Sequence, residues 1–99
     1  MRETILVYGN ESLSVMTPGL ILERAGYKVF TATKFAFALL AVVNERIDVL
    51  LLCQCLSDEE RRGIVETARA VKPEIECVHL DAMVAKLSQA DRAALAGLD

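Results

Sequence analysis

The stretch Asp48-Val49-Leu50-Leu51-Leu52-Cys53-Gln54-Cys55 decides the fold of this chain. Consecutive aliphatic residues, preceded by an acid and followed by a polar break, are typical of a strand that is buried on both faces. Such strands lie at the centre of parallel sheets, where helices cover both sides. Cys53 comes at the carboxyl end of this strand, and in open parallel sheets the functional site lies just beyond such ends. We therefore expect the residues around Cys53 to decide what the protein does.

Length and composition indicate one globular domain that covers residues 1–99. The chain is 54% hydrophobic and 25% charged, which allows a single core and excludes a disordered chain. The net charge of −3 gives no broad electrostatic reason to bind nucleic acid. The longest apolar run, residues 35–43, is too short to span a membrane, and we expect no secretion leader. Three cysteines without framework spacing predict reduced thiols in a cytoplasm.

Three more strands are expected beside the central one, and the first helix is the hardest to place. The predicted strands are residues 4–8, 28–32, 48–53 and 75–80. Pro18 lies in the segment after the first strand, and proline in a helix interior removes an amide donor and clashes with the preceding turn. At the first helical position it is tolerated, with Thr17 as the cap. We therefore expect a loose turn over residues 11–16, then a helix from Pro18 to Ala25 that ends at a left-handed Gly26.

The later helices carry clearer end signals. Thr33 is expected to cap a helix over residues 34–46. Ser57-Asp58-Glu59-Glu60 is a capping box, and its helix is expected to end at residue 71 or 72, before Pro73. The tail is expected to be mainly helical over residues 83–98, with a short fifth strand at 84–87 as the alternative. Alternating strands and helices predict right-handed crossovers and an α/β fold of three layers, in which helices cover both faces of a mainly parallel sheet.

These elements resemble the receiver domain of bacterial response regulators. The resemblance covers residues 4–82 and rests on four stretches: Ile5-Leu6-Val7-Tyr8, Glu23-Arg24-Ala25-Gly26-Tyr27-Lys28-Val29, Thr31-Ala32 and Asp48-Val49-Leu50-Leu51-Leu52. It implies a flavodoxin-like, CheY-like arrangement of four strands in the order 2-1-3-4. It also implies a truncated receiver, about one strand-helix unit short at its carboxyl end.

The same resemblance implies that the receiver's phosphorylation chemistry is missing. Receivers hold magnesium with two adjacent acids after the first strand, and those positions are Gly9 and Asn10, with Glu11 beside them. The phosphate-accepting aspartate falls on Cys53, and the hydroxyl residue after the fourth strand falls on Asp81. The family's lysine has no convincing counterpart. Magnesium prefers carboxylate oxygens, and these positions offer it an amide and a soft thiol. We expect a degenerate site with no catalytic residue, no metal and no cofactor.

The leading hypothesis is a non-enzymatic, receiver-like signalling module that acts through a protein partner or as a homodimer. Phe37, Leu40 and Val43 occupy places that are usually polar in receivers, and their spacing of three puts them along one side of the second helix. An exposed apolar stripe marks a contact surface. The alternative is that this helix is buried more deeply, by the tail. For self-association, we expect the bare sheet face or the open edge of the fourth strand to be buried.

A second hypothesis is a thiol redox switch or a metal site. Cys53-x-Cys55 and Cys77-x-His79 lie on neighbouring predicted strands, and residues two apart on a strand share a face. Cys77 is expected mid-strand and Cys55 beyond its strand end, so we expect the four side chains not to meet at one point. Cys53 also lies near helix amino termini, which favour thiolate. The base rates favour cysteine as a small buried hydrophobe and His79 as a structural residue. A phosphorelay protein with an unusual acceptor is a third hypothesis, and the missing acids disfavour it.

Overall fold

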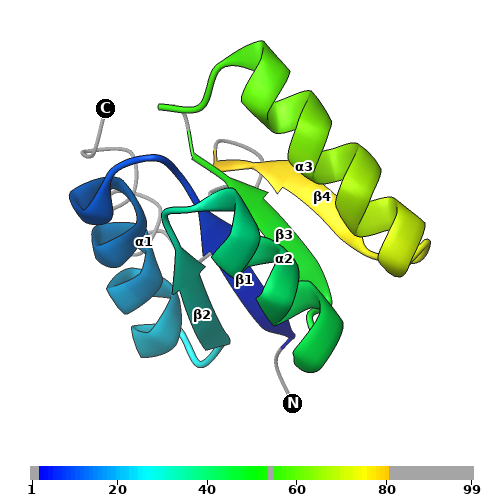
Figure 1. Ribbon diagram of the computed structural model, residues 1–99. Coiled ribbons are helices and arrows are strands. Elements are labelled where there is room, and N and C mark those ends of the chain that lie inside the picture. The colour runs from blue at the N-terminus through cyan, green and yellow to red at the C-terminus, as the bar shows by residue number, and fades with distance from the viewer. Residues whose placement is uncertain (1–2, 54, 81–99) are drawn as a thin grey trace.

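The computed structural model describes residues 3–53 and 55–80, which form a parallel sheet flanked by helices (Figure 1). The elements are β1 (Thr4–Tyr8), α1 (Ser12–Arg24), β2 (Lys28–Ala32), α2 (Phe35–Asn44), β3 (Val49–Leu52), α3 (Asp58–Val71) and β4 (Glu76–His79). The strand order is β2-β1-β3-β4, and every neighbouring pair is parallel. The predicted fold class and strand order are therefore confirmed. The predicted tail helix, the alternative fifth strand and the truncation concern residues that lie outside the described ones.

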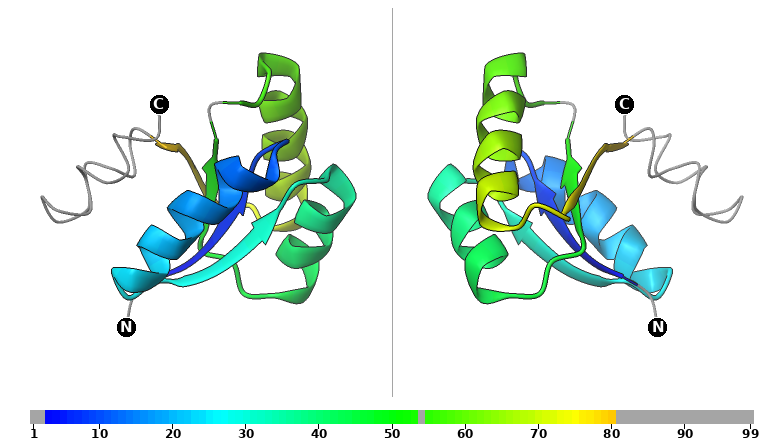
Figure 2. Two further views of the ribbon diagram at one scale, coloured as in Figure 1. Left: turned by 90° about the vertical axis from the view of Figure 1, so that its left-hand side faces the viewer. Right: turned by 90° about the vertical axis from the view of Figure 1, so that its right-hand side faces the viewer.

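The sheet separates two halves of the core, with α1 on one face and α2 and α3 on the other (Figure 2). Successive residues of a strand point to opposite faces. Val49 and Leu51 of β3 therefore pack with the α1 residues, and Leu50 and Leu52 pack with the α2 and α3 residues. All four are at most 3% exposed. The aliphatic run is thus buried on both faces, as its composition predicts.

Helix α1 contradicts the prediction for residues 11–25. The structure has one continuous helix from Ser12 to Arg24 with Pro18 inside it, and Thr17 is not its cap. The capping position is Glu11, whose side chain makes no capping hydrogen bond. Pro18 lacks the N–H that would donate to the carbonyl of Ser14, four residues earlier. The Cys53 thiol donates to that oxygen instead, at 3.2 Å, so a contact from another element compensates for the lost bond.

Two glycines explain how α1 joins β2. Gly26 has a φ of 100°, which confirms the predicted left-handed stop after the helix. Gly19 faces β2, and a methyl group on it would lie 3.2 Å from Cγ2 of Thr31 and 3.5 Å from Cγ1 of Val29. The missing side chain at Gly19 therefore lets α1 lie close to the edge strand.

The remaining helices differ from the predictions only at their ends. Helix α2 begins one residue later than expected, with Lys34 rather than Thr33 at the capping position, and it makes no side-chain capping bond. The capping box of α3 is confirmed: Glu60 N–H donates to Ser57 Oγ at 3.1 Å, and Ser57 N–H donates to Glu60 Oε1 at 2.9 Å. In the described part of the chain, no helix has the length and apolar character that crossing a bilayer requires.

Candidate functional site

The candidate site lies where β1 and β3 end side by side. Tyr8 and Leu52 are partners in the register, so Gly9 and Cys53 follow at the same edge of the sheet. The Cys53 N–H donates to the carbonyl of Tyr8 at 3.0 Å, and the Gly9 N–H donates to that of Ala32 at 3.3 Å. These bonds continue the sheet beyond the strands. The structure thus brings together two of the positions that the receiver resemblance singled out, Gly9 and Cys53.

The space beside Gly9 is closed. A Cβ atom on Gly9 would lie 3.0 Å from Cβ of Cys53, 3.1 Å from Sγ of Cys55 and 3.1 Å from Cγ1 of Val15. The Cβ of Cys53 is attached directly to the strand backbone, so it cannot rotate away. Side chains from α1 and from the segment after β3 therefore fill the volume that an acid at position 9 would require.

The Cys53 thiol is buried and serves as a hydrogen-bond donor. Its residue is 2% exposed, and Sγ lies 3.2 Å from the carbonyl oxygen of Ser14. Burial raises the pKa of Cys53 to about 12, and the nearby Cys55 adds to the increase. The thiol is therefore protonated at neutral pH, whereas nucleophilic attack and metal binding require thiolate. The expected stabilisation of a thiolate by helix amino termini is contradicted, because desolvation dominates.

Asn10 holds the loop after β1 against the start of α3. Its side-chain Nδ2 donates to the carbonyl of Cys55 at 3.0 Å and lies 3.4 Å from Oε1 of Glu60. The backbone N–H of Ser57 contributes most to lowering the pKa of Glu60, and hydrogen bonds from the side chains of Ser57 and Asn10 lower it further. Asn10 thus makes structural contacts where receivers carry an acid. This role was not predicted from the sequence, although the Glu60 carboxylate of the capping box is a partner that an amide can bind.

The four residues of the thiol or metal hypothesis do not form one site. Cys53 and Cys55 pack in the core half that contains α1, whereas Cys77 packs in the half that contains α2 and α3. His79 is exposed and opposite Leu52 in the register, on the side of Cys77. Among residues 3–53 and 55–80, no group of three or more His, Cys, Asp or Glu side chains could hold a metal ion. The hypothesis of a shared site is therefore wrong.

Three other candidate positions are Glu11, Asp81 and Cys77. Glu11 is exposed beside the site and occupies the capping position of α1 without a side-chain bond. Asp81, the expected counterpart of the receiver's hydroxyl residue, lies outside the described residues. Burial raises the pKa of Cys77, while the charge of Arg69 and its hydrogen bond to the thiol act in the opposite direction. Neither Glu11 nor Cys77 shares the closed space beside Gly9.

The candidate stripe on α2 faces solvent. Phe37, Leu40 and Val43 are 59%, 52% and 57% exposed, whereas Ala38 and Val42 are buried under the same helix. The helix therefore buries a narrow side of small residues and exposes large apolar ones. The alternative prediction, burial of this helix by the tail, depends on residues outside the described ones and stays a prediction.

A second exposed apolar stripe was missed. Leu13, Met16 and Leu20 of α1 are 76%, 52% and 62% exposed, and their spacing of three and four places them on one side of the helix. Pro18 had predicted a loose turn over residues 11–16. Without a helix there, Leu13 and Met16 could not be aligned with Leu20.

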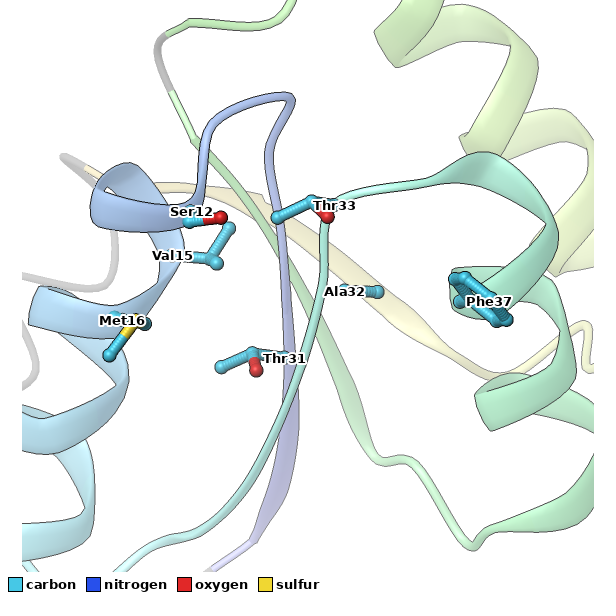
Figure 3. Close-up of a pocket in the computed structure, with 7 residues that line it drawn as sticks. All are labelled: Ser12, Val15, Met16, Thr31, Ala32, Thr33 and Phe37. Atoms are coloured by element: carbon cyan, nitrogen blue, oxygen red, sulfur yellow. The ribbon is translucent and has the colours of Figure 1, made fainter.

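Two hollows lie along β2, and the larger one lies between α1 and α2. The larger one has a volume of about 300 Å³, and Figure 3 shows Met16 of α1 and Phe37 of α2 on either side of Thr31. Its lining consists of Ser12, Val15, Met16, Thr31, Ala32, Thr33 and Phe37. The smaller hollow, of about 200 Å³, shares Met16 and Thr31 and adds Leu20 and Val29. Mostly uncharged side chains therefore line two neighbouring hollows beside the edge strand.

Comparison with solved structures places the fold among receiver domains. One similar structure is a CheY-like response regulator receiver domain protein from Methanospirillum hungatei JF-1, with a TM-score of 0.70 and 24% identity over 80% of this chain and 63% of that chain. Another is a response regulator receiver domain protein from Clostridium thermocellum, with a TM-score of 0.64 and 22% identity over 96% of this chain and 92% of that chain. No protein-family model matches the chain, and no curated protein matches it significantly. At these identities the likeness shows the fold, and the predicted flavodoxin-like receiver fold is confirmed.

Proposed function

We propose that this protein is a non-catalytic, receiver-like signalling module that acts by protein–protein contact and carries no aspartyl phosphate. The observation that carries the proposal is the closed space at the carboxyl ends of β1 and β3. Three side-chain atoms lie within 3.1 Å of the position that a Cβ on Gly9 would occupy. A carboxylate and a hydrated magnesium ion need room and oxygen ligands at that point.

The side chains around this space support the proposal chemically. Phosphoryl transfer depends on metal ions and cationic groups that neutralise the charge developing on the phosphoryl oxygens. Here the Asn10 amide is directed to Cys55 and Glu60, and the Cys53 thiol is directed to the carbonyl of Ser14. Because burial raises the pKa of Cys53 to about 12, the thiol is also a poor nucleophile for a phosphodonor. The residues at the degenerate site are thus used to hold the fold together.

The exposed stripe of Phe37, Leu40 and Val43 supports the contact role. Contiguous apolar side chains on a domain surface mark interaction sites. The occupant under this proposal is a protein, either a partner or a second copy, and the net charge of −3 disfavours nucleic acid. Cys53, Cys55 and Cys77 are all free, which supports a cytoplasmic location, where thiols stay reduced.

The phosphorylation part is tested by intact mass after incubation with acetyl phosphate and magnesium. An active receiver domain treated in parallel serves as the positive control for the donor. We expect the mass of this protein to stay unchanged while the control gains a phosphoryl group. A stoichiometric phosphate adduct on this protein that disappears in Cys53→Ala contradicts the proposal.

The contact part is tested with Leu40→Glu and the matched control Val71→Glu. Both side chains are about half exposed, at 52% and 47%, but Val71 is on α3 and outside the stripe. We expect both variants to stay folded by circular dichroism, because neither charge enters the core. Unfolding of Leu40→Glu alone contradicts an exposed contact stripe and supports burial of α2 in solution.

A further inference from the structure

Two thiols share the closed space beside Gly9. A Cβ on Gly9 would lie 3.0 Å from Cβ of Cys53 and 3.1 Å from Sγ of Cys55. Two atoms that lie so close to one point are within about 6 Å of each other, and a disulfide needs the same two atoms about 3 Å apart. Both cysteines are free, and both pack in the half of the core that contains α1. A rearrangement of the two side chains therefore brings their sulfurs together.

The backbone after β3 has a shape that suits such a short disulfide. The Leu56 N–H donates to the carbonyl of Cys53 at 3.3 Å, which closes a turn that begins at Cys53. In a turn of this kind the first and third Cα atoms are about 5–6 Å apart, inside the range of about 4.4–6.8 Å that disulfides span. The side chain of Asn10 donates to the carbonyl of Cys55 at 3.0 Å, so the loop after β1 also holds the turn in place.

We infer that Cys53 and Cys55 form a redox site, at which a small disulfide such as oxidised glutathione converts the two thiols to a reversible disulfide. Cys55 is the more exposed thiol, and its thiolate attacks one sulfur of glutathione disulfide, whose S–S bond breaks and releases one glutathione. Cys53 then attacks the sulfur of Cys55, and the second glutathione leaves with the proton of Cys53. Two protein thiols are thus oxidised while one glutathione disulfide is reduced to two thiols. Burial of Cys53 makes the second step the slow one.

The disulfide acts on helix α1 through one hydrogen bond. The Cys53 thiol donates to the carbonyl of Ser14 at 3.2 Å, and Pro18 has no N–H for that carbonyl. A disulfide sulfur carries no hydrogen, so oxidation removes this donor. The amino-terminal half of α1, which presents the exposed Leu13 and Met16, then loses a contact that holds it to the end of β3. The redox state of the two cysteines is thereby coupled to the exposed side of α1, and this coupling does not depend on the proposed contact function.

The disulfide is tested by peptide mass mapping of the full chain after equilibration with reduced and oxidised glutathione. Trypsin releases Cys53 and Cys55 together in residues 47–61, and Cys77 separately in residues 70–86. We expect residues 47–61 to lose two hydrogen atoms under oxidising conditions and to regain them in reduced glutathione, while Cys77 stays open to alkylation. Cys55→Ser is the matched control, because it keeps the donor to Ser14 but cannot form the disulfide.

The coupling to α1 is tested by amide hydrogen exchange of the reduced and oxidised protein. We expect exchange in the amino-terminal half of α1 to rise by about fivefold on oxidation, which is the effect of one lost hydrogen bond. In Pro18→Ala the helix has its own N–H for the carbonyl of Ser14, so oxidation should change the exchange much less. Circular dichroism is measured on every variant to verify the fold.

Three results overturn the inference. One is that residues 47–61 keep two alkylated thiols, or carry only bound glutathione, at the most oxidising ratio. Another is a disulfide that includes Cys77. The last is exchange in α1 that is unchanged by oxidation or that rises equally in Pro18→Ala, because the bond to Ser14 is then not the link between the thiols and the helix. All three leave the proposed function standing, because it uses neither thiol.

Discussion

The hydrogen bond between the Cys53 thiol and the Ser14 carbonyl gives the sharpest prediction, because a third residue, Pro18, leaves that carbonyl without its helical donor. Pro18 deprives the Ser14 carbonyl of its helical donor, and the Cys53 thiol replaces that donor at 3.2 Å. We expect Cys53→Ala to leave the carbonyl without this donor. The loss of an acceptor's partner costs about 1–3 kcal/mol, and Ser14 is only half-buried, so we take about 1 kcal/mol. Removing the buried sulfur adds about 1 kcal/mol, comparable to one methylene.

The expected destabilisation of Cys53→Ala is therefore about 2 kcal/mol in the free energy of unfolding. Urea denaturation followed by circular dichroism measures it. The same substitution is then made with Pro18→Ala, whose new N–H can donate to Ser14 within the helix. In that background we expect Cys53→Ala to cost about 1 kcal/mol less, since only the packing is lost.

The double-mutant cycle separates this mechanism from ordinary packing. Cys53→Ser keeps a donor at the same position and serves as the control for the hydrogen bond. If Cys53→Ala lowers the free energy of unfolding by the same amount with and without Pro18, within the ~0.3–0.5 kcal/mol by which independent substitutions add, the thiol does not compensate for the proline. That result refutes the reasoning.

Three further predictions follow from the same region. Gly9→Asp is expected to destabilise the fold by about 1–3 kcal/mol without creating magnesium binding, because its Cβ would lie too close to Cys53, Cys55 and Val15. An unchanged free energy of unfolding in urea contradicts the conclusion that the space beside Gly9 is closed. The pKa of Cys53 is raised from 9.0 to about 12 in the folded state, so the folded state loses stability as the pH rises from about 9 to 12 and the unfolded thiol deprotonates first. Over that pH range we expect the urea midpoint of the wild type to fall by more than that of Cys53→Ala. An equal fall in both proteins excludes Cys53 as the cause. Ser57→Ala removes the capping hydrogen bond of α3 and is expected to lower the free energy of unfolding by about 1 kcal/mol. Thermal unfolding measures the change, with Thr67→Ala, which loses a hydroxyl hydrogen bond inside the same helix, as the comparison. An unchanged melting temperature of Ser57→Ala contradicts a stabilising cap.

The sequence predicted which positions form much of the candidate site, but not the contacts that their side chains make. The resemblance correctly paired the end of β1 with the end of β3, so Gly9 and Cys53 were expected to be neighbours. The pKa of Cys53 could not be read from the sequence, because it depends on how completely α1 and Cys55 bury the thiol. Cys53 and Cys77 do not meet, as expected, and the register adds the reason. Neighbouring strands can direct these residues to opposite faces, and only the register decides which face each one takes.

The sequence alone determined the features that depend on short-range chemistry. The aliphatic run before Cys53 specified a buried strand, the Ser57–Glu60 spacing specified a helix start, and Gly26 specified a left-handed stop. These signals act within a few residues, where backbone geometry limits the outcomes. The tertiary structure decided whether α1 continues through Pro18, because the donor that replaces the missing N–H comes from Cys53, 39 residues beyond Ser14. It decided the second apolar stripe for the same reason, since Leu13 and Met16 share a side with Leu20 only once that helix exists.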